Sequence, residues 1–247
     1  MKHLNYIFFS LLIIGLVSCK DDPSATEGTV TLHFKAVYDE ETLQMFNTRP
    51  FENGEFLEFT QLVMIISDLE LLRQGSAELL DEVEIVNLSF DNTTAAEAGY
   101  ILTISGVPTG TYDGLRFGVG VPADVNAKKP ADFPSSNPLS NTAHYWTPWS
   151  SYIFMKTEGR LDTLGNGNLD LGFALHTGSD ALYSILEANI PLTVEEGMET
   201  NLDIVIDYKK VLQGVDIKAN PQNHSPDDIS TITVIVNNLA IAFSLVL

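Results

Sequence analysis

The chain of 247 residues has a single cysteine, and its 13 lysine and arginine residues are outnumbered by 33 aspartate and glutamate residues, which gives a formal net charge of −20. One thiol can form neither an intrachain disulfide nor a thiolate metal cluster. The shortage of positive charge argues against a nucleic-acid partner, because such binders need clustered lysine and arginine to displace counterions. It also disfavours docking on anionic lipid through surface charge.

Sequence signatures of catalysis are missing as well. The chain has no Gly-x-Ser-x-Gly elbow, no phosphate-binding glycine loop and no Ser-His-Asp order. Adjacent acidic residues occur at 21–22, 40–41, 195–196 and 227–228, where they are more typical of solvated or helix-capping charges than of acid–base pairs. We therefore expect no catalysis by this chain alone.

The N-terminal apolar run is too short to span a membrane. It covers residues 8–17, whereas a spanning helix needs about 20 residues. With Lys2 before it, the run has the length of a signal-peptide core, and Leu16-Val17-Ser18-Cys19 after it forms a lipobox. We expect residues 1–18 to be a signal peptide that is cleaved before Cys19, and lipid on Cys19 to anchor the protein to a membrane.

Residues 19–28 are predicted to be a flexible tether between the lipid and the folded domain. Residues 21–28 contain no large apolar side chain and include Pro23, Ser24 and Thr26. Lys20-Asp21-Asp22 resembles the short charged signal that directs many Bacteroidetes lipoproteins to the outer leaflet of the outer membrane. The expected location is the cell envelope, at the outer membrane, facing the periplasm or the cell surface.

Residues 29–247 have the pattern of a β domain. Residues 29–38 alternate clearly, with the apolar side chains Val30, Leu32, Phe34 and Ala36 on one face and Thr31, His33 and Lys35 on the other. Turn signals follow at Asn53-Gly54, 74–76 and 106–112. Regularly spaced short strands predict a mainly β fold, an antiparallel β-sandwich that forms a single domain. The about 220 residues suffice to bury a core without disulfides.

Two segments depart from this pattern. Residues 122–143 contain Pro130, Pro134 and Pro138 and show no periodicity, which predicts a long loop of the kind that often carries function. Residues 225–228 combine a capping serine, a proline and two acids, which are signals of a helix start. The following residues 229–242 are rich in β-branched side chains. The pattern therefore leaves a short C-terminal helix open.

The segment of residues 144–152 is the densest in unusual side chains. It holds His144, two tyrosines and both tryptophans of the chain, Trp146 and Trp149. Such a cluster can bury itself to anchor the preceding loop, or it can form a binding surface. His176 ends an apolar strand, His224 lies in a loop, and His33 is on the polar face of its strand. Imidazoles without thiolates suit Cu(II), Zn(II) or Ni(II), but the spacing alone does not bring them together.

The order of motifs resembles the MbnP family of exported copper-binding proteins, which are often encoded beside a di-haem, peroxidase-like partner called MbnH. The more specific part of the resemblance is the paired tryptophans, the strand that ends in Glu158-Gly159 and the His176-Thr177-Gly178 that follows. The matching stretches are residues 30–34, 65–71, 106–112, 117–121, 145–152, 158–159, 175–178 and 238–243.

This resemblance implies a β-sandwich that binds one copper ion through histidine and a tryptophan-derived ligand. In the family, the partner oxidises a tryptophan to kynurenine, whose aryl amine and ketone can bind metal where an indole cannot. Trp146 and Trp149 match the paired tryptophans, and His176 matches the strand-end histidine. The resemblance does not say which tryptophan is modified.

The chain departs from the family pattern at several positions. Thr147-Pro148 separate the tryptophans where the family has one residue, and Ser151 stands where it has glycine. Ala36 occupies a position where many members carry histidine. His144 or His33 would then have to take the place of that ligand. The alternative function is a cell-surface binding or adhesion module that kept the fold without the metal.

Overall fold

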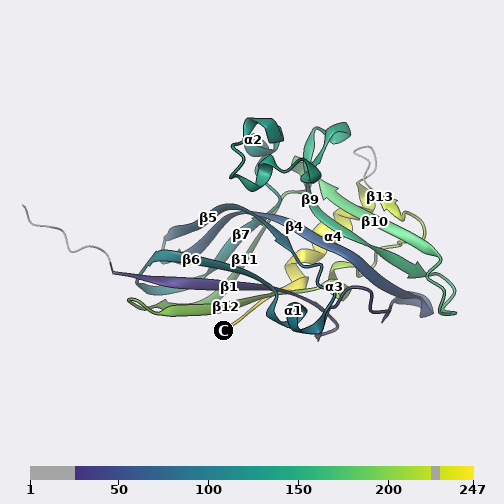
Figure 1. Ribbon diagram of the computed structural model, residues 1–247, viewed down its shortest axis with the longest axis horizontal. Helices are drawn as coiled ribbons and strands as arrows, with labels where there is room; N and C mark the ends of the chain where they lie inside the picture. The colour runs from purple at the N-terminus through teal and green to yellow at the C-terminus, as the bar shows by residue number, and fades with distance from the viewer. Residues whose placement is uncertain (1–25, 224–228) are drawn as a thin grey trace, which may run out of the picture.

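The computed structural model describes residues 26–223 and 229–247. The predicted signal peptide, Cys19, His224 and the helix-start signals of residues 225–228 lie outside these residues. The described chain forms two β-sheets packed face to face, which confirms the predicted mainly β sandwich (Figure 1).

The smaller sheet is built around the first long strand. The hydrogen-bonded order runs β14-β12-β1-β2, and β6 also pairs with β1. Its strands are β1 (Glu27–Tyr38), β2 (Glu41–Thr42), β6 (Tyr100–Pro108), β12 (Glu199–Asp207) and β14 (Phe243–Val246).

The larger sheet is built around β4 (Phe56–Arg73), which is 18 residues long. Its order runs β11-β7-β4-β9-β10-β13, while β3 and β5 pair with β4, and β8 pairs with β9. The other strands are β3 (Arg49–Pro50), β5 (Ser76–Asn87), β7 (Gly110–Val119), β8 (Tyr145–Trp146), β9 (Ser151–Asp162), β10 (Leu171–Gly178), β11 (Ser184–Val194) and β13 (Gln222–Asn223).

The long strand β4 joins two halves of the larger sheet. Its first part pairs with β9, and its second part pairs with β5 and β7. The change of partner falls close to a bulge at Asp68, whose φ of 48° lies in the left-handed region. Figure 1 shows β5 and β7 on one side of the molecule and β9 and β10 on the other. The sequence pattern does not show this change of partner, because the pairing depends on segments that are distant in sequence.

Strand pairing is antiparallel with two exceptions. β1 pairs with β12 in parallel, and β10 pairs with the short β13 in parallel. Parallel neighbours need a long crossover connection, and between β1 and β12 that connection includes most of the other sheet. The predicted antiparallel sandwich therefore contains a parallel pair at the centre of the smaller sheet, because strands far apart in sequence meet there.

The core lies between the sheets and follows the predicted alternation of β1. Val30, Leu32, Phe34 and Ala36 are buried, and Phe34 packs edge to face on Phe117 of β7 with ring centroids 6.1 Å apart. Fully burying such side chains contributes about 1.5–3 kcal/mol each. The polar side chains of β1, such as Lys35, therefore point to the outer face.

The C-terminal helix left open by the sequence is present as α4 (Ser230–Ala242). Its buried residues Ile232, Ile235 and Leu239 recur at helical spacing, and α4 contacts β10 of one sheet and β12 of the other. Burial between two sheets compensates for the weak helix propensity of β-branched residues. No helix in the described ranges is long and apolar enough to cross a membrane.

The remaining helices are one to two turns long. They are α1 (Thr93–Ala98), α2 (Ala123–Asn126), α3 (Tyr208–Val211) and the 3₁₀ turns η1 (Glu52–Gly54), η2 (Pro130–Asp132), η3 (Pro138–Ser140), η4 (Thr142–His144), η5 (Thr147–Trp149) and η6 (Asp180–Leu182). Four of them, α2 and η2 to η4, lie within the proline-rich segment 122–143 or at its end.

The proline-rich segment is an ordered cap on the larger sheet rather than an open loop. Tyr152 of β9 anchors it by donating a hydrogen bond to the carbonyl of Leu139, at 2.9 Å, and its ring packs against Tyr145 and Phe133. A second, smaller core of Ile65, Val121, Leu139, Tyr152 and Phe154 fills the space beneath it.

Candidate functional site

The β9–β10 pair brings His176 to the outer face of the larger sheet. Lys156 of β9 lies directly opposite His176 of β10. Side chains alternate between the two faces of a strand, so Lys156, Glu158 and His176 share the face opposite the buried Thr157 and Leu175. His176 Nε2 lies 2.7 Å from Glu158 Oε1. Three polar side chains thus meet on one patch of this face.

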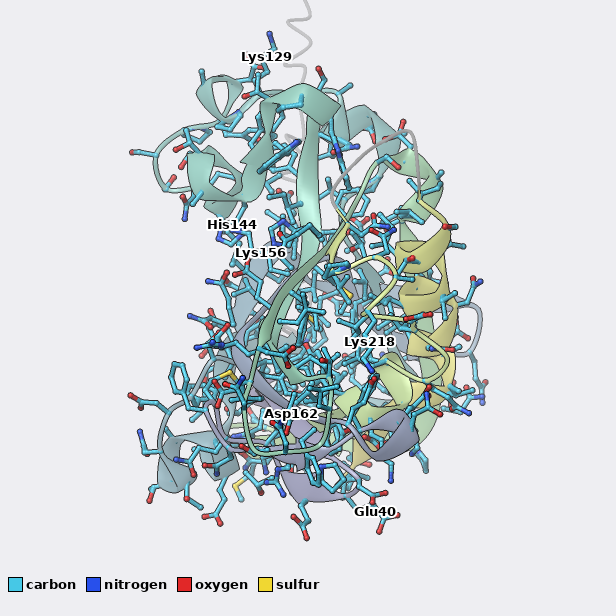
Figure 2. The ribbon with its side chains drawn as sticks, turned by 90° about the vertical axis from the view of Figure 1, so that its right-hand side faces the viewer. Glu40, Lys129, His144, Lys156, Asp162 and Lys218 are labelled. Atoms are coloured by element: carbon cyan, nitrogen blue, oxygen red, sulfur yellow. The ribbon has the colours of Figure 1, made fainter. Side chains whose placement is uncertain are left out.

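His144 reaches the same patch from the cap. It ends η4, which contacts β9, and the ammonium of Lys156 donates a 2.8 Å hydrogen bond to the carbonyl of the preceding Ala143. Figure 2 shows His144 beside Lys156. Burial, and then the positive charge of Lys156, lowers the pKa of His144 to about 4. Its imidazole is therefore neutral at physiological pH, which is the form that binds metal ions.

Trp149 lies over the end of β10. The following Ser150 adopts a left-handed conformation, with φ of 50°, and turns the chain into β9. A Cβ built on Gly178 would stand 2.6 Å from Cζ3 of Trp149, so the missing side chain of Gly178 leaves room for the indole. Its Nε1 is buried and has no hydrogen-bond partner among the described residues. Trp146 lies in β8, where it pairs with Ser151 at the start of β9.

A buried polar network holds the turn that carries Trp149. The amide oxygen of Asn126 accepts hydrogen bonds from Ser151 Oγ at 3.1 Å and from the backbone N–H of Tyr152 at 2.9 Å. Its amide nitrogen donates to Asp180 at 2.8 Å, and Ser151 Oγ accepts from the N–H of Ser179 at 2.9 Å. Such satisfied networks rigidify a structure. This one ties the cap, β9 and the end of β10 together.

His33 does not belong to this patch. It lies on β1 of the other sheet, on the face opposite the core residues Leu32 and Phe34. Its ring nitrogens contact the carbonyl of Ala98, at 3.3 Å, and the amide oxygen of Asn201, at 3.2 Å. The structure therefore brings His144 and His176 to Lys156 and leaves His33 apart. Trp149 packs on the main core at the end of β10, and Trp146 lies on the strand beside β9.

Comparison with known proteins decides the family. The MbnP family model matches residues 27–226. The chain belongs to the MbnP family. The solved structure of MbnP from Methylosinus trichosporium has the same fold, with a TM-score of 0.56 and 14% sequence identity over 89% of this chain and 98% of that one. No curated protein matches the chain.

The donor chemistry of this MbnP-family patch fits a copper site in part. His144 supplies a neutral imidazole, and the Nε2 of His176 contacts a carboxylate. Within residues 26–223 and 229–247, however, no three His, Cys, Asp or Glu side chains gather as a metal cage. An indole does not bind metal, so a third ligand from Trp149 or Trp146 requires its oxidation. The fit therefore depends on a modified tryptophan.

A sizeable pocket of this MbnP-family chain lies elsewhere. Its volume is about 690 Å³, and its lining includes Tyr38, Arg49 and Asp207. Figure 2 shows Glu40, which lies between the two lining acids Asp39 and Glu41, at the far end of the molecule from His144. The metal candidates and this pocket are therefore separate features.

Sequence reasoning missed Lys156 and Asn126 as parts of the site, and it noted Glu158 only as part of a motif. The register of the β9–β10 pair would have found Lys156 and Glu158, because both lie within two positions of the residue opposite His176. A hairpin centred on Asn166 gives this register. Asn126 carries no comparable signal, because its partners are distant in sequence and meet only in the fold.

Replacing Gly178 with alanine should displace Trp149. The new Cβ would lie 2.6 Å from the indole ring and 2.8 Å from the carbonyl of Tyr152, and overpacking of this kind costs about 1–3 kcal/mol. Gly172→Ala on the same strand is the control, since nothing lies within 4 Å of its Cβ position. Tryptophan fluorescence and urea unfolding should change in Gly178→Ala only. Equal effects of the two variants would contradict the contact.

The lowered pKa of His144 should make the metal-free protein sensitive to acid. Between the usual pKa of 6.5 and the folded value of about 4, the unfolded chain binds a proton that the folded chain does not, so stability falls as the pH falls. From pH 7 to pH 5 this contributes about 2 kcal/mol. When urea unfolding is measured at pH 7 and at pH 5, the wild type should lose about 2 kcal/mol more stability on acidification than His144→Gln. Equal losses of stability in the two proteins would refute the burial of a neutral imidazole at this position.

Proposed function

We propose that this protein is an envelope lipoprotein that binds one copper ion through His176, His144 and an oxidised tryptophan, for copper acquisition or handling. The observation that carries the proposal is that His144 and His176 both lie beside Lys156 in a chain that belongs to the MbnP family, with Trp149 packed on the end of the strand that carries His176. Copper is the metal that the resemblance to this family implies. His33 lies on the other sheet and has no part in the proposed site.

The surroundings of Trp149 support a tryptophan modification as part of this proposal. With dioxygen as the oxidant, both oxygen atoms enter across the indole C2–C3 bond, and hydrolysis then releases C2 as formate and leaves an aryl amine and a ketone. An MbnH-like di-haem protein is the proposed partner for this step. Trp149 is the favoured target, because its buried Nε1 has no hydrogen-bond partner in the described part of the chain and the indole lies at the end of the His176 strand.

Protein produced with its di-haem partner should retain one copper ion through purification. Tryptic peptide 129–156, which contains both tryptophans, should gain about 4 Da, since tryptophan loses one carbon and gains one oxygen. His176→Ala should abolish copper retention, and His33→Ala, the control on the other sheet, should keep it. Metal analysis measures the bound copper, and mass spectrometry measures the mass of the peptide. No bound copper together with an unmodified peptide would remove the copper proposal.

Lipid on Cys19 should account for all membrane attachment of the protein. A diacylglyceryl group supplies the two chains that stable anchoring needs. Cys19→Ser should abolish incorporation of labelled palmitate into the protein and leave residues 1–18 uncleaved, which increases the mass by that of the signal peptide. Ser24→Ala in the tether is the control and should be labelled and cleaved as the wild type is. A Cys19→Ser protein that is still labelled would contradict the anchor.

The second candidate function is a surface binding or adhesion module without metal. The 690 Å³ cavity favours it, because the volume is that of a small-molecule site and its lining is remote from the histidines. Its charged side chains are paired, as in the contact of Lys209 Nζ with Asp39 Oδ2 at 2.7 Å. The same His176→Ala variant separates the two functions, because the adhesion module predicts no copper in the wild type and no effect of the substitution on ligand binding.

A further inference from the structure

The contact between Glu158 and His176 is the closest polar interaction on the patch for which the structure gives a distance. The two side chains come from neighbouring strands and lie on one face, as a diagonal pair across the β9–β10 ladder. His176 Nε2 and Glu158 Oε1 are 2.7 Å apart, and the side chains are 12% and 30% exposed. The pair is thus shielded enough from water for the hydrogen bond to orient the ring.

The chemistry of the carboxylate determines which ring nitrogen carries the proton. A carboxylate offers only hydrogen-bond acceptors, so the nitrogen that faces it must donate. His176 Nε2 therefore carries the hydrogen, and in the neutral ring the lone pair is on Nδ1. The β9–β10 ladder holds the backbones of Glu158 and His176 at a fixed spacing, which keeps the carboxylate within reach of the ring.

We propose that Glu158 is a positioning residue that holds His176 as the Nε2–H tautomer and makes Nδ1 the nitrogen that binds the metal. The inference rests on the proposed copper function for its last clause only. Carboxylates that accept from a ligating histidine in this way also raise its basicity, and their removal costs about 10–100-fold in metal affinity. His144 is held differently, since its charged neighbour is the ammonium of Lys156.

The tautomer can be measured without copper. Long-range ¹H–¹⁵N correlation spectra of the full-length, metal-free protein should show His176 as the Nε2–H form. In Glu158→Gln the amide can accept or donate, so the spectra should show a mixture of tautomers. Glu187→Gln on β11, where Glu187 faces Arg116, is the control and should leave the His176 signals unchanged. An Nδ1–H form in the wild type, or an Nε2–H form unaffected in Glu158→Gln, would overturn the proposal.

Copper titration of partner-processed protein is the second readout. Glu158→Gln should raise the copper Kd about 10–100-fold, with an unchanged circular dichroism spectrum and an unchanged mass of peptide 129–156. Full affinity in a variant whose tautomer has changed would overturn the assignment of Nδ1 as the ligand. If the processed wild type binds no copper, the proposed function fails, while the tautomer of the metal-free protein still decides what Glu158 does.

Discussion

Backbone hydrogen bonds between β9 and β10 hold Lys156 opposite His176 and place Glu158 within 2.7 Å of its ring. A shift of this register by one residue would turn every side chain to the other face of the sheet and bury the charges in the core. The apolar residues Phe173 and Leu175 on the inner face oppose such a shift, because both are buried between the sheets. Core packing thereby determines the geometry of the outer patch.

The cap over the larger sheet is held by β9, and it brings His144 to the patch that the β9–β10 pair forms. Tyr152 and Asn126 tie the proline-rich segment to the start of β9, which carries η4 and η5 to the edge of the patch. His144 and His176 then lie near one ammonium, that of Lys156, but in different surroundings. Burial keeps one imidazole neutral, and a carboxylate orients the other. In a chain with 33 acidic and 13 basic residues, this local positive charge is unusual.

Much of the fold could be predicted because alternation is a local pattern. The buried and exposed faces of β1 are those of the sequence, and the family resemblance identified the paired tryptophans and His176 as one motif set. The continuity of β4 and the parallel pairing of β1 with β12 could not be predicted, because both depend on contacts between distant segments. The ordered structure of residues 122–143 could not be predicted for the same reason, because the hydrogen bonds of Tyr152 and Asn126 leave no periodic pattern in the sequence.

The sequence by itself determined the strand faces, the turns and the chemistry available, because these depend on residues a few positions apart. One thiol and four histidines after residue 18 make imidazole nitrogen the main strong donor available to a transition metal. Only the tertiary structure decided which histidines meet. His33 and His176 looked alike as strand histidines, but the packing of two sheets sends the first to an outer face of one and the second to an outer face of the other.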